Sequence, residues 1–310
     1  MQLLFNILAI IANGINCLFH LLFSGLKRQV YHYATSHGHK RKLNLYMPGS
    51  SKNPAPLILF FHGGGYVGGS KFIIEPGVQR QVKRGYAVAS ISYSFLKVGP
   101  WPLQIHEAKA AIRYLKKNAQ TLGIDPDRFI VWGVSAGAHL ASMLGATSGT
   151  GHLEGDLGNH ESDSVVHGAV VWYPPIDMTK IIDPGIPKFV MDKITTQVIG
   201  GPLEEYWQVA ETLMPLNYIG PHTPPYYILH GDRDRVVPIN QSNMLYDAMM
   251  AKGLDITYKK VKGFAHADPR FNRKEYIEPI EQFMDGITKF KTVPIQQPVK
   301  KIEGIINVRD

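Results

Sequence analysis

Runs of hydrophobic residues bounded by turn residues recur through most of this 310-residue chain. Several runs are continuously apolar rather than alternating, which is typical of strands buried on both faces of a mostly parallel sheet. The predicted strands cover residues 29–34, 41–47, 57–61, 86–93, 129–133, 168–173, 226–230 and 255–262. We therefore expect a sheet at the centre of the fold.

The segments between these runs carry hydrophobic residues at helical spacing. Residues 102–122 place them on one face, with Gly123 as a stop signal, and residues 240–252 and 274–290 repeat the pattern. Strands that alternate with helices predict an α/β fold, with a mostly parallel, doubly wound sheet and helices on both faces. Residues 174–215 are rich in Pro, Gly and Met and interrupt the alternation, so we interpret them as a cap insertion.

The first 26 residues are apolar and uncharged, and polar side chains interrupt them along a narrow stripe. On a helix these polar residues fall within about 80° of one another: Gln2, Asn6, Asn13, Asn16, His20 and Ser24. Such a helix has a broad apolar surface and a thin polar seam. Three locations fit it: a membrane interface, helped by Lys27 and Arg28; a cap helix docked over the active site of the same domain; or a secretory signal, for which a basic start and a clear cleavage site are lacking.

Charge and cysteine content narrow the class of protein. The net charge is +8, but the basic residues form only short clusters, and no nucleic-acid-binding motif accompanies them. We therefore expect a solvated basic surface and no nucleic-acid partner. Cys17 is the only cysteine, so no internal disulfide bond can form.

The most informative motif is Gly133-Val134-Ser135-Ala136-Gly137, which directly follows a predicted strand and precedes a helical segment. A serine hydroxyl is a weak nucleophile until a base removes its proton, and the two glycines allow a sharp turn that exposes it at the edge of the sheet. The motif alone arises by chance in roughly one chain in ten of this length. Its strand–turn–helix setting makes Ser135 our candidate nucleophile.

A second motif, His-Gly-Gly-Gly-Tyr, starts at His62 directly after the predicted strand 57–61. Attack on an ester carbonyl builds negative charge on its oxygen, and backbone N–H groups of glycines can reach that oxygen. The glycines also match the GxGxxG pattern of dinucleotide-binding loops, which requires an acidic residue about 20 positions later. The next strand ends in Ser92-Tyr93 instead, so we favour an oxyanion hole.

Two loops near the C-terminus supply an acid and a base. Asp232 and Asp234 follow the predicted strand 226–230, and His266 follows the predicted strand 255–262. A serine, then an acid, then a histidine is the chain order of the α/β-hydrolase fold. We choose Asp234 as the acid that orients His266, and we interpret Asp232 as a residue that shapes the turn.

We expect no metal ion and no cofactor. The pair His106-Glu107 lacks the second histidine of a zinc-binding helix. The two aspartates at 232 and 234 lack the glycine and the distal glutamate of a calcium loop.

The two glycine-containing motifs resemble those of the hormone-sensitive-lipase-like esterases, which have the α/β-hydrolase fold. Three further stretches are similar to one branch of that family: GIDPDR at 123–128, SAGAHL at 135–140 and LEGDLGN at 153–159. The branch holds bacterial feruloyl and acetyl-xylan esterases, with prenylcysteine methylesterases and kynurenine formamidases as relatives. The resemblance covers residues 33–290. It implies that the backbone amides of Gly64, Gly65 and Ala136 form the oxyanion hole and that Tyr66 lines the acyl pocket.

These observations predict a serine carboxylesterase that hydrolyses short- to medium-chain esters through a Ser135, His266 and Asp234 triad and an acyl-enzyme. An amidase or arylformamidase with the same triad is the alternative, and a non-catalytic ligand-binding receptor is a more remote one.

The expected organisation is an N-terminal helix at 1–28, an α/β-hydrolase catalytic domain at 29–291 that contains the cap, and a C-terminal tail at 292–310. An ester is the expected small-molecule partner. We favour a membrane-associated or cytoplasmic location over a secreted one, with the N-terminal helix as the segment that would contact a membrane surface.

Overall fold

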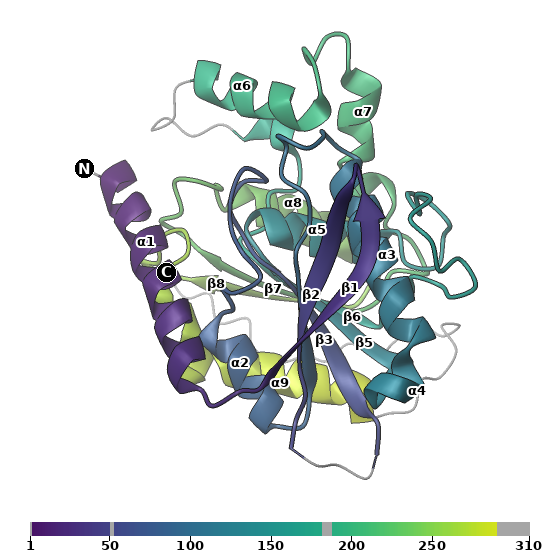
Figure 1. Cartoon of the computed structure of the whole chain (residues 1–310). Helices are drawn as coiled ribbons and strands as arrows, with labels where there is room; N and C mark the ends of the chain where they lie inside the picture. The colour runs from purple at the N-terminus through teal and green to yellow at the C-terminus, as the bar shows by residue number, and fades with distance from the viewer. Residues whose placement is uncertain (1, 50–52, 182–187, 290–310) are drawn as a thin grey trace.

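The computed structural model describes residues 2–49, 53–181 and 188–289, and within them the chain forms an eight-stranded sheet of order β1-β2-β4-β3-β5-β6-β7-β8. The strands are β1 (Arg28–Ser36), β2 (His39–Tyr46), β3 (Ala55–Phe61), β4 (Ala87–Ile91), β5 (Ile124–Val134), β6 (Gly168–Trp172), β7 (Tyr226–Gly231) and β8 (Ile256–Val261). β2 pairs antiparallel with β1 and β4, and all other neighbours are parallel. The predicted α/β-hydrolase fold with a mostly parallel sheet is confirmed (Figure 1).

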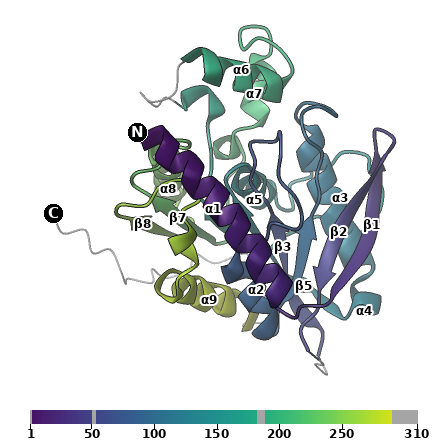
Figure 2. The same cartoon turned by 60° about the vertical axis from the view of Figure 1, so that its left-hand side comes forward.

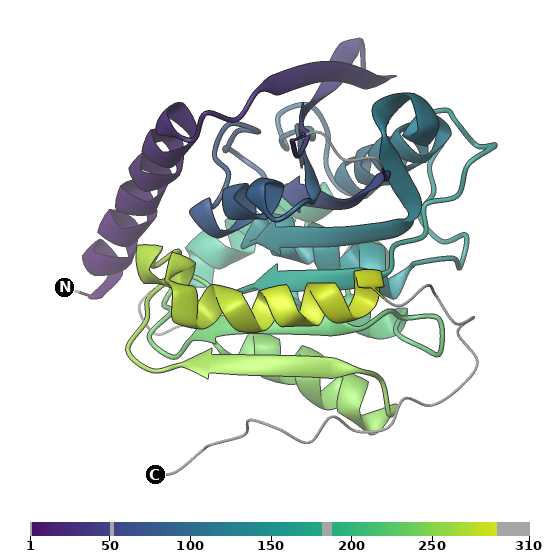
Figure 3. The same cartoon turned by 90° about the horizontal axis from the view of Figure 1, so that it is seen from below.

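Helices cover both faces of the sheet, as predicted. The helices are α1 (Gln2–Phe23), α2 (Pro76–Lys83), α3 (Leu103–Lys117), α4 (Ala119–Leu122), α5 (Ala136–Ala146), α6 (Lys188–Ile199), α7 (Trp207–Thr212), α8 (Asn240–Ala251) and α9 (Lys274–Lys289). Short 3₁₀ turns are η1 (Met178–Lys180), η2 (Pro215–Asn217) and η3 (Pro269–Asn272). The core on one face includes α3, α5 and α8, and the core on the other includes α2 and α9, which lie across the near face in Figure 3.

Strand β3 shows why its sequence is continuously apolar. Leu57 and Leu59 join the core beneath α3 and α5, whereas Ile58 and Phe60 join the core beneath α2 and α9. All four side chains are fully buried. Successive strand residues point to opposite faces, so a strand covered by helices on both sides has no position left for a polar side chain.

The prediction of a single helix over residues 102–122 is wrong in one detail, because two helices occupy this segment. α3 ends at Lys117 and α4 begins at Ala119. Between them the side-chain amide of Asn118 donates a hydrogen bond to the carbonyl of Tyr114 at 2.8 Å. An asparagine that bonds to nearby backbone competes with the helical ladder, which explains the break.

The predicted cap segment forms a separate layer. α6 and α7 stand above the sheet at the top of Figure 1, and the 3₁₀ turns η1 and η2 connect this layer to the domain below. Residues 182–187 of the predicted cap, and the whole predicted tail 292–310, lie outside the described residues.

Helix α1 lies along the outside of the domain against α2 and η3, and Figure 2 turns this side of the molecule toward the viewer. Its described part is docked on the domain, and the predicted membrane contact and the predicted cap over the active site stay predictions. The side chain of Asn13 is buried and donates to Glu75 Oε1 at 2.8 Å. No helix in the described part of the chain has both the length and the hydropathy needed to cross a membrane.

Candidate active site

Ser135 occupies the turn between β5 and α5 in a strained backbone conformation, with φ 54° and ψ −123°. At Gly133 and Gly137 of this turn another backbone segment lies too close to leave room for a side chain, so both positions require glycine. A Cβ atom at Gly133 would lie 2.0 Å from the carbonyl oxygen of Gly137, and one at Gly137 would lie 2.1 Å from that of Phe61. The Ser135 N–H donates to the carbonyl of Trp172 on the next strand at 3.0 Å. These contacts hold the serine at the carboxyl edge of the parallel strands.

The structure brings the three predicted triad residues together. His266, on the loop after β8, has Nε2 at 3.0 Å from Ser135 Oγ and Nδ1 at 2.6 Å from Asp234 Oδ2. A carboxylate oxygen can only accept, so Nδ1 carries the proton and donates to Asp234. In the neutral ring Nε2 then carries the lone pair that faces the serine hydroxyl. This tautomer is the one that a general base beside Ser135 requires.

Asp234 is buried in the loop after β7, and polar groups surround its carboxylate. The backbone N–H groups of Val236 and Val237 donate to Oδ1 at 2.9 and 2.8 Å. Burial by itself pushes the pKa of Asp234 upward, but the neighbouring His266 and His230 outweigh it and hold this pKa well below its usual value. Asp234 therefore stays ionised throughout the neutral range.

Two residues that sequence reasoning did not single out support this pair. His230, the penultimate residue of β7, is fully buried. Its Nε2 lies 3.3 Å from Asp234 Oδ2, and its Nδ1 lies 2.7 Å from Ser242 Oγ. Tyr173 follows β6 and packs edge-on against the His266 ring, with ring centroids 4.7 Å apart. Their shared signal in the sequence is a position at the carboxyl end of a buried strand, where the site lies.

Asp232 is the second acid of the predicted loop. Among the described residues we observe no hydrogen bond between Asp232 and His266. Its Oδ1 accepts a hydrogen bond from the Gly263 N–H at 2.6 Å. This contact joins the loop after β7 to the loop after β8, which carries the histidine. Asp232 thus links two loops of the site, which differs from its predicted role of shaping its own turn, and it makes none of the observed contacts between Ser135, His266 and Asp234.

The glycine-rich loop after β3 passes close to Ser135. A Cβ atom added at Gly63 would lie 3.2 Å from Ser135 Cβ. Gly64 and Gly65 have φ of 120° and 60°, which favour glycine. On the other side of the serine, Ala136 is the first residue of α5. The N–H groups of a first helical turn lack partners within the helix. Gly63 and Ala136 thus lie next to Ser135, and the oxyanion-hole role of the Gly64, Gly65 and Ala136 amides stays a prediction.

Tyr66 is buried beneath this loop and belongs to a chain of hydrogen bonds. Its hydroxyl oxygen lies 2.6 Å from His139 Nδ1, and His139 Nε2 lies 2.7 Å from the carbonyl oxygen of Leu213. A carbonyl only accepts, so Nε2 carries the proton, Nδ1 accepts, and Tyr66 donates. Burial lowers the pKa of His139 to about 4, so the ring is neutral. The hydroxyl of Tyr66 thus ties the loop to α5; its predicted contact with an acyl group stays a prediction.

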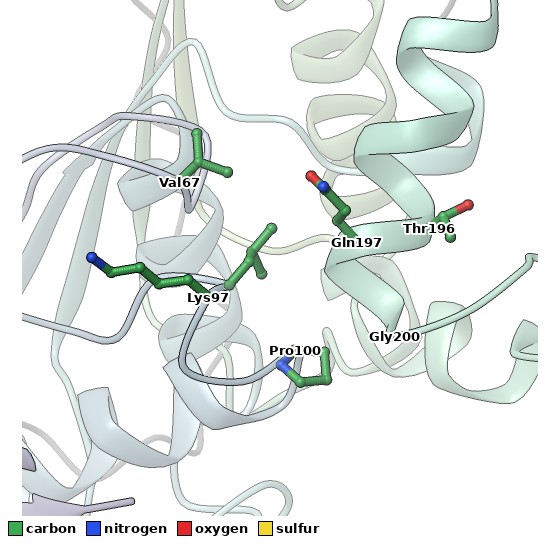
Figure 4. Close-up of a pocket in the computed structure, with 7 residues that line it drawn as sticks. Val67, Lys97, Pro100, Thr196, Gln197 and Gly200 are labelled. Atoms are coloured by element: carbon green, nitrogen blue, oxygen red, sulfur yellow. The ribbon is translucent and has the colours of Figure 1, made fainter.

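A cleft of about 540 Å³ opens beside the same loop. It lies between the domain and cap helix α6, and its lining residues are Val67, Leu96, Lys97, Pro100, Thr196, Gln197 and Gly200. In Figure 4 the Gln197 side chain extends from α6 toward Val67, while the amino group of Lys97 points away from α6. No group of three or more His, Cys, Asp or Glu side chains in the described residues is placed to hold a metal ion.

The sheet order and the turn that carries Ser135 are those of an α/β-hydrolase with a serine, acid and histidine in that chain order. The chain belongs to the BD-FAE family, whose model matches residues 43–249. It is also 28% identical over 215 residues to Esterase LipC of Mycobacterium tuberculosis, an alignment that covers 69% of this chain and 53% of LipC. This chain spans about half the length of the first curated relatives that it matches.

Two further comparisons extend beyond the family match. Isoprenylcysteine alpha-carbonyl methylesterase ICME of Arabidopsis thaliana is 24% identical over 311 residues, covering 91% of this chain and 71% of that protein. A solved structure described as a truncated carbohydrate esterase from gut microbiota is 26% identical, with a TM-score of 0.74 over 84% of this chain and 97% of that one. The resemblance to hormone-sensitive-lipase-like esterases is confirmed at the level of fold and family.

Proposed function

We propose that this protein is a serine carboxylesterase that hydrolyses short- to medium-chain esters through an acyl-enzyme on Ser135. The observation that carries the proposal is the continuous path from Ser135 Oγ through the His266 ring to the buried Asp234 carboxylate, beside a loop rich in backbone N–H donors. The esterase names of the curated relatives support the same reaction class.

In the first step Ser135 Oγ attacks the carbonyl carbon of the ester while His266 Nε2 takes the hydroxyl proton. The carbonyl oxygen gains the electron pair of its former π bond and becomes an oxyanion. The amides of Gly64, Gly65 and Ala136 are the donors that we assign to it. When the tetrahedral intermediate collapses, the C–O bond to the alcohol breaks and His266 returns the proton to the leaving alkoxide.

In the second step a water molecule repeats the attack on the acyl-enzyme. His266 takes a proton from the water, the second tetrahedral intermediate collapses, and Ser135 Oγ leaves with the proton that His266 returns. Asp234 remains an anion throughout, which its lowered pKa favours, and stabilises the imidazolium that forms in each step. The products are the free alcohol and the carboxylic acid, and the enzyme regains its starting state.

The cleft between Val67 and Gln197 supports a substrate of modest size. Its volume of about 540 Å³ lies within the range of small-molecule pockets, which run from roughly 300 to 1,000 Å³. Val67 directly follows the glycine-rich loop, so a group bound in the cleft lies next to the proposed oxyanion hole. We assign the cleft to one end of the ester.

Hydrolysis of p-nitrophenyl acetate, butyrate, octanoate and palmitate tests the proposal. We expect wild type to hydrolyse the shorter esters and Ser135→Ala to lose kcat on the order of 10⁶-fold, because no other group supplies the nucleophile. Ser142→Ala is the matched control, since this serine lies two turns further along α5 and its hydroxyl bonds to the Ala138 carbonyl at 2.8 Å.

A fluorophosphonate probe separates the remaining outcomes. Mass spectrometry should find the probe on wild type and on Ser142→Ala but not on Ser135→Ala. Labelling without hydrolysis of any ester would contradict an esterase and favour an amidase with the same nucleophile. Folded wild-type protein that neither hydrolyses esters nor takes up the probe would contradict nucleophilic catalysis altogether.

A further inference from the structure

Helix α1 is docked through a narrow side and leaves large apolar residues outward, whereas an ordinary surface helix buries its apolar face. Asn13 and Cys17 face the domain and are buried. The opposite side of the helix exposes five large apolar side chains: Ile11 at 54%, Ile15 at 64%, Leu18 at 41%, Phe19 at 58% and Leu22 at 80%. A contiguous apolar stripe of this kind on a protein surface marks a binding surface.

Buried polar contacts fix this orientation of the helix. Glu75 accepts hydrogen bonds at 2.8 Å from the side-chain amides of Asn13 in α1 and Asn272 in η3. Gln79 in α2 donates to the backbone carbonyl of Cys17 at 3.1 Å. Turning α1 by half a turn to bury its apolar stripe would take the Asn13 amide away from the buried Glu75, which is costly. The outward apolar stripe is therefore a built feature of the fold.

The N-terminal part of the chain, which includes α1, carries basic side chains. The first 74 residues of the chain contain seven Lys and Arg residues and no Asp or Glu, and the first carboxylate, Glu75, is buried under α1. Three of these cations gather just beyond the C-terminal end of the helix. The Arg28 guanidinium lies 5.0 Å and the Lys71 ammonium 5.2 Å from the ring centre of Phe72. Partial burial and then the charges of Lys42 and Arg28 lower the pKa of Lys71.

We propose that α1 seats this protein on an anionic membrane surface. The helix lies in the plane of the interface, with its apolar stripe among the lipid headgroups and the cations at Arg28, Lys42 and Lys71 against lipid phosphates. Apolar burial and the attraction of basic residues to anionic lipids act together in interfacial helices. A second copy of this chain would cover the apolar stripe equally well, but it carries the same net charge of +8 and would bring further cations to those at Arg28, Lys42 and Lys71.

The seating of α1 adjoins the candidate active site. His266 lies three residues before η3, and Asn272 of η3 is a partner of the same Glu75 that holds Asn13. One segment therefore connects the proposed membrane contact to the loop of the catalytic histidine. The proposal itself does not rest on esterase activity, because only the surface of α1 and its neighbouring cations carry it.

Co-sedimentation of the full chain with vesicles tests the proposal. We expect binding to phosphatidylcholine vesicles that contain phosphatidylglycerol, weaker binding at high salt, and little binding to pure phosphatidylcholine. The double variant Ile15→Glu with Leu22→Glu should bind at least about 10-fold more weakly, because it places charges in the apolar stripe. The double variant Arg28→Gln with Lys71→Gln should lose about 10-fold or more in affinity for the anionic vesicles.

Met250→Glu is the matched control, since Met250 is an exposed apolar residue of α8. It should bind vesicles as wild type does, and thermal melts and hydrolysis of soluble p-nitrophenyl butyrate should show that all variants fold. Vesicle binding that is absent in wild type, or unchanged by the Ile15 and Leu22 substitutions, would overturn the proposal. A dimer that dissociates on Leu22→Glu, without vesicle binding, would assign the stripe to a second copy instead.

Discussion

Two buried carboxylates, one in the candidate active site and one beneath α1, meet opposite surroundings. Asp234 is bonded to two backbone N–H groups and two imidazoles, and its pKa is held well below the usual value. Glu75 is bonded to the neutral side chains of Asn13, Asn272 and Cys17, and burial raises its pKa in spite of these bonds. A buried carboxylate thus stays ionised where a group that can carry positive charge lies beside it, and neutral donors compensate less completely.

This difference separates the roles of the two regions. The Asp234 carboxylate must remain an anion while the His266 ring gains and returns a proton. Glu75 has no such requirement, and its contacts serve to orient α1. The same side-chain chemistry therefore produces an electrostatic partner at one site and a structural contact at the other, and each of three substitutions tests one side of the comparison.

The largest effect is expected from Asp234→Asn. An amide in this position no longer stabilises the imidazolium and favours the wrong tautomer of His266, so kcat for p-nitrophenyl butyrate should fall on the order of 10⁴-fold. Asp232→Asn is the matched control, because Asp232 bonds to Gly263 and not to the histidine. Equal losses in the two variants would contradict the choice of Asp234 as the triad acid.

A smaller effect on stability is expected from Glu75→Ala. Loss of the shared acceptor removes one hydrogen bond each from the side-chain amides of Asn13 and Asn272, so the free energy of unfolding at pH 5 should fall by about 1–3 kcal/mol. The raised pKa gives the sign of the pH dependence: the stabilising contribution of Glu75 is greatest below its unfolded value of 4.5 and declines as pH rises through the folded value. The loss should therefore be smaller at pH 8.

Urea unfolding of wild type and Glu75→Ala at pH 5 and pH 8 measures this effect. Glu205→Ala, at an exposed position in the segment before α7, should change stability little at either pH. A loss of stability that grows from pH 5 to pH 8 would mean that the anionic form of Glu75 is the stabilising one, as it is for Asp234. That result would contradict the difference between the two carboxylates.

The smallest effect is expected from Tyr66→Phe, which removes one neutral hydrogen bond inside the candidate active site. The bond to His139 orients the glycine-rich loop, and a hydrogen bond of this kind contributes about 1 kcal/mol, so kcat should fall roughly 3- to 10-fold with an unchanged pH profile. Tyr258→Phe, on β8 at the sheet edge, is the control. A loss beyond about 10²-fold would show that the Tyr66 hydroxyl acts on the substrate directly.

Local patterns in the sequence were enough to predict the fold and the triad contacts. Apolar runs mark strands such as β3 because helices cover both of its faces, and the glycines at 133 and 137 mark the turn of Ser135 because backbone approaches there exclude any side chain. Asp234 and His266 follow late strands, and the parallel sheet brings the carboxyl ends of those strands to one edge. Each signal depends on residues close together in the chain.

Contacts between distant segments were decided by the tertiary structure alone. Tyr66 meets His139 across 73 positions and Asn13 meets Glu75 across 62, and no periodicity in the sequence encodes such pairs. The polar seam of α1 was visible in the sequence, but its direction was not. Periodicity reports that a helix has two unlike sides, whereas the neighbour that it packs against decides which side is buried. Here that neighbour is the buried side chain of Glu75, which requires hydrogen-bond donors, so Asn13 faces inward.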